Sequence, residues 1–185
     1  MNTTADTQTT NTWQIDTAHT EVGFVVKHMM FAKVRGGFNE FTGSIVQGEN
    51  GDLTGGSFSA TIQTSSVDTG NEDRDAHLRS GDFFDSENFP NITFNSTSVE
   101  RVAEGQLKVT GELTIRDVTK TITLDVTETG TGVDPWGNMR IGIQAEGTIN
   151  RKDFGLIWNQ ALEAGGVLVG EEVTLTIEAQ AVAQG

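Results

Sequence analysis

The sequence predicts an all-β fold in which about eight antiparallel strands form a sandwich or a barrel. Three observations support this prediction: apolar residues alternate with polar ones in several long runs, the polar positions are rich in threonine, and turn residues separate the runs. Alternation with a period of two gives a strand one buried and one solvated face, as in antiparallel sheets. Threonine at the solvated positions favours strands.

The alternating runs follow one another from Trp13 to the end of the chain. Their apolar phase is occupied by Val22, Phe24 and Val26, by Phe58, Ala60 and Ile62, by Leu107, Val109, Gly111, Leu113 and Ile115, by Ile122, Leu124 and Val126, by Ile141, Ile143, Ala145, Gly147 and Ile149, and by Val173, Leu175, Ile177, Ala179 and Ala181. Turn signals separate the runs, among them Asn50-Gly51, Glu104-Gly105 and the stretch 131–137. No linker, repeat or charge block interrupts the series, so residues 12–185 are expected to form a single domain.

One segment departs from the alternation and predicts a short helix at about residues 70–80. Thr69 and Glu72 match a capping box, in which the glutamate reaches back to the threonine. Gly81 follows the segment and is expected to supply a left-handed cap. The helix has too few apolar residues for a core helix, so we expect it to lie across one edge or end of the sheet structure.

The wider segment Asp68–Phe89 is predicted to act as a lid over that end. Its helix has only Ala76 and Leu78 as apolar anchors, and a helix of this length is marginal alone in water. Its stability must therefore come from caps and from the docking of Phe83, Phe84 and the phenylalanine that ends the segment.

The first eleven residues are almost wholly polar, contain five threonines and are predicted to form a mobile tail. They lack a positively charged region followed by an apolar run, so they do not match a signal peptide. A cytoplasmic location is expected if Met1 is the natural start. No stretch approaches the roughly 18 apolar residues of a membrane helix, so no stable membrane insertion is expected.

Charge and cysteine content exclude several classes of function. Acidic residues outnumber basic ones by 26 to 12 and the net charge is −14, which argues against nucleic-acid binding and disfavours a docking face for anionic membranes. The chain has no cysteine, so it has no disulfide and no thiolate metal site. His19, His28 and His77 belong to no metal or triad motif, so no catalytic residue, metal or cofactor is predicted.

The apolar phase mixes large residues with small ones, which bears on whether the interior is hollow. The small residues are Gly111, Gly147, Ala60, Ala145, Ala179 and Ala181. An eight-stranded barrel is about wide enough to pack full or to hold one small ligand. Small inward residues would leave room for a ligand, whereas phenylalanines from other strands would fill the same gaps, and periodicity leaves both outcomes open.

Several segments together resemble the YceI-like family over nearly the whole chain after Thr12. They are Trp13–Asp16 with His19, Val22–His28, Lys33–Gly36 leading to Phe38 and Phe41, Asn71–Ser80 followed by Asp82–Asp85 and Phe89-Pro90, Leu113–Ile115 with Val118–Lys120, and Asn150–Gly155 with Trp158. The resemblance implies an extended lipocalin-like antiparallel barrel whose elongated apolar cavity holds a polyisoprenoid or another long-chain amphiphile. Many members are exported, and this sequence departs from them in showing no signal segment.

The resemblance brings no catalytic residue to this chain, so we expect a binding protein and not an enzyme. The ligand would be a polyisoprenoid, an isoprenoid quinone or a fatty-acid-like lipid, and the protein would act as its carrier, store or sensor. The strand phase selects the expected lining: Phe24, Val26, Phe58, Ile62, Phe94, Leu113, Ile115, Ile141, Ile143 and Leu175. Phe83 and Phe84 are expected at the mouth. A polar head group would meet Arg74, His77 and Arg79, unless the arginines pair with neighbouring aspartates.

Two other classes of function stay open at this point. A filled β-sandwich acting as an interaction module would show a solid core and a flat exposed apolar patch. A lipid-modifying enzyme on a barrel scaffold would bring His28 and His77 together beside a carboxylate in the cavity. The oligomeric state is also open, with a homodimer as one option.

Overall fold

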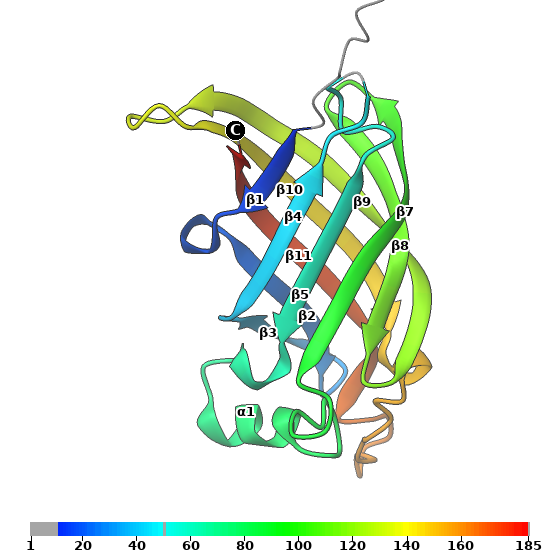
Figure 1. Ribbon diagram of the computed structural model, residues 1–185. Coiled ribbons are helices and arrows are strands. Elements are labelled where there is room, and N and C mark those ends of the chain that lie inside the picture. The colour runs from blue at the N-terminus through cyan, green and yellow to red at the C-terminus, as the bar shows by residue number, and fades with distance from the viewer. Residues whose placement is uncertain (1–10, 50, 185) are drawn as a thin grey trace, which may run out of the picture.

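The computed structural model describes residues 11–49 and 51–184 and is built mostly of β-strands (Figure 1). The strands are β1 Thr12–Ile15, β2 Glu21–His28, β3 Ala32–Phe38, β4 Phe41–Val46, β5 Ser57–Gln63, β6 Val67–Asp68, β7 Asn91–Ala103, β8 Gln106–Ile115, β9 Val118–Val133, β10 Met139–Asn150 and β11 Val169–Gln184. The helices are α1 Glu72–Arg79 and the 3-10 turns η1 Thr17–His19, η2 Thr64–Ser66 and η3 Arg151–Phe154. The tail predicted for residues 1–11 lies, except for Asn11, outside the described residues. None of the described helices has the length and apolar character needed to cross a membrane.

Eight strands form a closed antiparallel ring, as the resemblance to the YceI-like family implied. Their order is β1-β4-β5-β7-β8-β9-β10-β11, and β11 pairs back with β1 to complete the ring. The fold is therefore a barrel and not a two-sheet sandwich. Closure removes the free sheet edges of the ring, so its backbone hydrogen bonds are shared all the way around.

The long strand β11 pairs with two different strands along the same edge. Its C-terminal part pairs with β1, from Ala181 to Gln184. Its N-terminal part pairs with β2, from Val169 to Glu178. The strands β1 and β2 thus lie one after the other along β11, and β2 continues the sheet into β3 and β6.

The predicted strand phases face the interior. In β8, burial alternates along the strand, with Leu107, Val109, Leu113 and Ile115 each at most 6% exposed. Period-two alternation of this kind is what places one set of side chains inside a closed barrel. The other set, rich in threonine, faces solvent.

The helix α1 begins two residues later than predicted, and its N-cap is Asn71 instead of Thr69. The Asn71 side chain accepts a hydrogen bond from the backbone N–H of Arg74 at 3.0 Å. Thr69 is not available for capping because its hydroxyl and its backbone N–H both donate to the buried carboxylate of Asp75. The capping-box prediction was therefore wrong in its residues, although the helix itself is confirmed.

The C-terminal cap also differs from the prediction. The helix ends at Arg79, and the backbone N–H of the C-cap residue Ser80 donates to the carbonyl of His77 at 3.1 Å. Gly81 is not among the residues with positive φ, so no left-handed glycine cap forms. Figure 1 places α1 and the segment that follows it across one end of the barrel, as expected.

Candidate ligand-binding cavity

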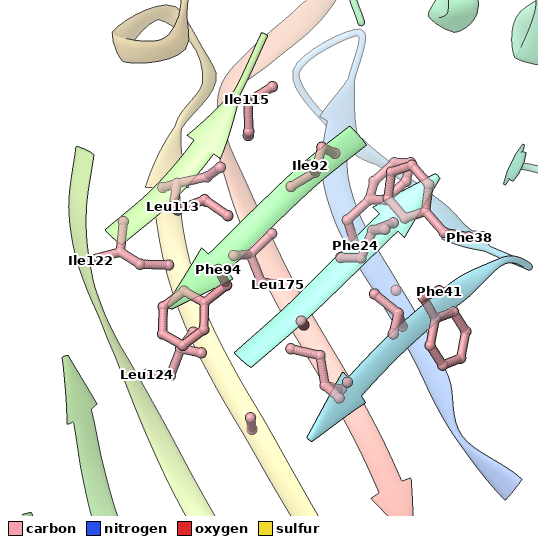
Figure 2. Close-up of a pocket in the computed structure, with 18 of the residues that line it drawn as sticks. Phe24, Phe38, Phe41, Ile92, Phe94, Leu113, Ile115, Ile122, Leu124 and Leu175 are labelled. Carbon is pink, nitrogen blue, oxygen red and sulfur yellow. The ribbon is translucent and has the colours of Figure 1, made fainter. Parts of the chain in front are cut away.

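A cavity of about 240 Å³ lies inside the barrel, next to the end that α1 covers. Figure 2 shows large apolar side chains from strands around the ring pointing into this space. Beyond the predicted positions, the apolar wall includes Ile15, Val22, Phe38, Phe41, Ile45, Ala60, Leu78, Ile92, Val109, Ile122, Leu124, Val126, Ala145, Ile149, Leu156, Val169, Val173, Ile177 and Ala179. This volume is slightly below the range of typical small-molecule pockets.

Few polar groups reach the wall. Ser44 and Ser59 contribute to it, and their hydroxyls bond to each other at 2.9 Å. Thr20 and Thr42 also line the cavity, and the Thr20 hydroxyl donates to the Gln180 carbonyl at 3.5 Å. A wall of this kind favours hydrocarbon, because an unpaired polar group placed against it would lose its hydrogen bonds to water.

The glycines of the inward phase do not create the hollow space, contrary to one of the two expectations. A Cβ on Gly111 would lie 2.5 Å from the Phe94 ring, and a Cβ on Gly147 would lie 2.7 Å from Leu124. The neighbouring side chains already occupy the space that these glycines leave. Three of the predicted small residues, Ala60, Ala145 and Ala179, do line the cavity, whereas Gly111 and Gly147 are not in its wall.

Eleven of the twelve side chains predicted to line the cavity or its mouth belong to its wall. They are Phe24, Val26, Phe58, Ile62, Phe83, Phe84, Phe94, Leu113, Ile115, Ile143 and Leu175. The exception is Ile141, which is buried but pairs with Ala181 in a part of the barrel that the cavity does not reach. Contact with a ligand remains a prediction for all twelve.

Aromatic rings close the cavity at the end under α1. Phe83 is buried, and it lines the cavity with Phe84 and Leu78. The rings of Phe24 and Phe38 are 5.7 Å apart, and Phe38 contacts Phe84 edge-on at 5.6 Å. Figure 2 shows Phe24 and Phe38 side by side. These contacts join the lid to the barrel wall through ring-to-ring packing.

A second aromatic group connects the lid to the segment that follows η3. His77 of α1 packs edge-on against Trp158 at 4.6 Å and against Phe83 at 5.1 Å. Its Nε2 lies 2.9 Å from a carboxylate oxygen of Asp82. Of the two apolar anchors that the sequence indicated, Leu78 packs against the core, whereas Ala76 is exposed. His77 helps to seat the lid where Ala76 does not.

The three residues predicted to meet a head group are not in the cavity wall. Arg74 donates to the hydroxyl and to the carbonyl of Thr69, at 2.7 and 2.8 Å. The aspartates weighed as its partners are not the groups it contacts. Arg79 and His77 are half-buried on α1 outside the cavity. His28 is also absent from the wall, so the two histidines do not meet beside a carboxylate in the cavity.

Arg151 is a charged residue of the cavity wall that was not predicted from the sequence. It is 4% exposed, and its guanidinium donates to four backbone carbonyls, those of Leu156, Trp158, Val169 and Gly170. These bonds fasten the segment between η3 and β11 to the barrel end. This arginine lies in the segment Asn150–Gly155, which resembles the YceI-like family. The alternation of apolar and polar residues did not indicate that its side chain turns inward.

The Arg151 charge is held by carbonyl dipoles. Within the described residues, no carboxylate lies within 4.0 Å of it. Burial lowers the pKa of Arg151 from its ordinary value, because the low-dielectric surroundings disfavour the charged form. The Phe83 ring lies 6.0 Å from its Cζ, which adds a cation–π contact to the lid.

The family of the chain can be established by comparing its sequence with those of known proteins. The sequence profile described as a YceI-like domain matches residues 13–181. The chain belongs to the YceI-like family. A UPF0312 protein of Staphylococcus aureus (strain N315) is 42% identical over 166 residues, which cover 89% of this chain and 94% of that protein. The resemblance found in the sequence is thus confirmed.

Solved structures show the same YceI-like fold. Burkholderia cenocepacia BcnA matches with a TM-score of 0.78 at 24% identity, covering 90% of this chain and 98% of its own. A structure described as a polyisoprenoid binding domain from Saccharophagus degradans matches with a TM-score of 0.68 at 18% identity, covering 93% and 98%. The YceI-like match spans every residue of the cavity wall described above.

Proposed function

We propose that this YceI-like protein binds one long-chain, mostly hydrophobic amphiphile of the polyisoprenoid class in the barrel cavity, as carrier, store or sensor. The observation that carries the proposal is the apolar cavity inside a closed barrel, lined at one end by aromatic rings that pack on one another. The description of the Saccharophagus degradans relative as a polyisoprenoid binding domain supports the same ligand class. The proposal is of binding without catalysis.

Burial of the tail would supply the affinity. Each buried methylene contributes about 0.8 kcal/mol, so about ten of them contribute about 8 kcal/mol before costs. Loss of free motion and ordering of the chain remove several kcal/mol of that. Because the wall offers few polar groups, selectivity would come from tail length and shape, and the head group would remain near the mouth.

The first experiment is extraction of the purified full-length protein with organic solvent, followed by mass spectrometry. We expect a near-stoichiometric long-chain lipid. The stripped protein should then bind cis-parinaric acid or geranylgeraniol. Protein that carries no lipid and binds neither probe would contradict the proposal.

A cavity-filling variant tests whether the probe enters the barrel. Ala145 lines the cavity, and Gln144 beside it on β10 is exposed on the outer face. Ala145→Phe should lower cis-parinaric acid affinity at least about tenfold, since the added ring takes the space of several methylenes. Gln144→Phe, the matched control, should bind as the natural protein does.

Overpacking can also unfold a barrel, so the circular dichroism melt of each variant is compared first. Ala179→Leu makes a smaller change in the same wall and provides a second test of probe binding in the cavity. If folded Ala145→Phe and Ala179→Leu both bind the probe unchanged, the probe lies outside the cavity and the proposal fails.

A further inference from the structure

The turn between β2 and β3 exposes large apolar side chains to solvent. Phe31 is 83% exposed, Met30 58% and Met29 39%. Figure 1 places this turn at the same end of the barrel as α1. The turn is fixed there, because the Met29 N–H donates to the Leu168 carbonyl at 2.8 Å and the Met30 side chain packs against Gly166. An exposed apolar group of this kind on a folded protein indicates a surface that something covers.

The backbone of this turn is unfavourable for the residues that occupy it. Met29 and Met30 have φ values of 53° and 71°, in the left-handed region that asparagine and glycine adopt most readily. A tight hairpin at this point would be more stable with Asn-Gly than with two methionines. The left-handed backbone of the turn therefore gives no reason for large apolar side chains at these two positions.

The strands that carry the turn present an unpaired group of cations. Lys27 of β2 and Lys33 of β3 lie directly opposite each other, and Arg35 follows on the same outer face. All three are exposed, and within the described residues none has a carboxylate within 4.0 Å. Like charges directly opposite each other destabilise a strand pair. In a chain with 12 basic and 26 acidic residues, one outer face of a short hairpin thus holds three of the 12 cations.

We infer that the β2–β3 hairpin is a docking element for an anionic lipid surface. Phe31 and the two methionines would enter the interfacial region of the bilayer, while Lys27, Lys33 and Arg35 would face its anionic head groups. The net charge of −14 opposes approach from a distance. That repulsion is screened beyond about 8 Å at physiological ionic strength, so at contact the local cations decide the sign.

The position of the hairpin would bring the cavity close to the bilayer. This step rests on the function proposed above. Val26, two residues before His28 at the end of β2, already belongs to the cavity wall. A lipid leaving the bilayer at this end would enter the cavity beside the lid without crossing bulk water. The loop between β9 and β10 lies at the opposite end of the barrel (Figure 1) and carries the exposed Trp136. It lacks this charge pattern, because Arg140 near the start of β10 is bound to Asp16 and Asp134.

Sedimentation of the full-length protein with lipid vesicles tests the inference. Vesicles of phosphatidylcholine with phosphatidylglycerol should bind the protein, pure phosphatidylcholine vesicles should bind it more weakly, and added salt should weaken binding to the anionic vesicles. Phe31→Ser should weaken binding about tenfold, because a large apolar side chain no longer enters the bilayer. The double variant Lys27→Gln/Lys33→Gln should weaken it about tenfold or more, because each cation adds attraction to an anionic surface.

One double variant separates docking from a structural role of the turn. Met29→Asn/Met30→Gly gives the turn the residues its backbone favours, so the melting temperature should rise while vesicle binding falls. Trp136→Ser and Lys108→Gln are exposed controls elsewhere on the barrel, and they should bind vesicles as the natural protein does.

Three results would overturn the inference: no preference of the natural protein for anionic vesicles, unchanged binding by the hairpin variants, or self-association that Phe31→Ser abolishes without any vesicle binding. The last would make the hairpin an interface between two copies of the chain. Binding of cis-parinaric acid without vesicles is measured in parallel, and the Phe31→Ser variant should retain it. If the natural protein does not bind cis-parinaric acid, the cavity proposal is contradicted. The vesicle measurements still decide the docking inference in that case.

Discussion

At the scale of single residues, the interior depends on pairs in which a glycine accommodates a large neighbour. Gly111 of β8 lies against the Phe94 ring, and Gly36 of β3 lies against the Phe24 ring, at 2.4 Å from where its Cβ would be. Strand periodicity predicts correctly that Gly111 faces inward. It cannot predict which ring from an adjacent strand enters the gap, because that depends on register between strands.

Replacing Gly111 by alanine should destabilise the protein by about 1–3 kcal/mol, the usual cost of overpacking a core. The added Cβ would lie 2.5 Å from Phe94 and 2.6 Å from the Asn95 carbonyl oxygen, and the backbone oxygen cannot move aside without disturbing the sheet. Gly132→Ala is the matched control, since a Cβ there meets nothing within 4 Å. Chemical denaturation measures both variants, and equal stability for the two would contradict this account of the pair.

Arg140 joins distant parts of the chain at the barrel end opposite the lid. It bonds to Asp16 at 2.7 Å and to Asp134 at 2.8 Å. The hydrogen bond from Arg140, with a smaller effect of His19, lowers the pKa of Asp16 from 3.8 to about 2. The pKa of Asp134 is also about 2, chiefly because the backbone N–H of Asn138 donates to it.

Because the folded-state pKa of Asp16 lies below its unfolded value, its contribution to stability is present above about pH 4 and lost as the pH falls towards 2. Arg140→Gln should therefore lower the melting temperature at pH 7, and its difference from the natural protein should shrink between pH 4 and pH 2. Lys120→Gln, an exposed control, should show no such pH dependence. A constant difference at every pH would show that Arg140 acts through packing alone.

At the scale of elements, the lid is the part that the sequence described least accurately. The helix was expected from its polar composition and caps, yet its actual caps are Asn71 and Ser80. The capping rules allow several neighbouring starts, and the choice was decided by the tertiary bond between Thr69 and Asp75. Arg151 was missed for a related reason, because its carbonyl partners lie up to 19 residues away in the chain.

The segment Asp68–Phe89 is still expected to open more readily than the barrel. Most of α1 is exposed, and its docking depends on Leu78, His77, Phe83 and Phe84. Amide hydrogen exchange should be faster here than in Leu107–Ile115, whose bonds belong to the closed ring. Loading with geranylgeraniol should slow exchange in the lid selectively, because a tail under Phe83 adds contacts to its inner side.

Equal exchange in the lid of loaded and stripped protein would place the entrance elsewhere. The turn at Met29–Phe31 and the loop at Pro135–Trp136 are the next candidates. The exchange of Leu107–Ile115 serves as the internal reference, since a general slowing of the whole barrel would reflect overall stabilisation by ligand instead of a local effect.

At the scale of the whole molecule, the antiparallel β fold was predictable because the alternation marks the inner face of each strand independently. Closure and the hollow interior were not predictable from the alternation alone. Ring closure depends on β11 meeting β1, which are at opposite ends of the sequence. The hollow depends on the difference between the volume enclosed by the ring and the summed volume of the inward side chains, a small remainder of about 240 Å³.

A cavity of fixed size makes a prediction about tail length. Saturated primary alcohols of increasing length should bind the stripped protein with affinity that rises about fourfold per methylene, which is the ratio that corresponds to about 0.8 kcal/mol. The rise should stop when the tail fills the cavity, because further methylenes remain in water or force the lid open. Ala145→Phe should stop it at a shorter tail, whereas Gln144→Phe should follow the natural protein. Titration against cis-parinaric acid measures the series, and an affinity that keeps rising equally in all three proteins would show that the tails bind on the outer surface.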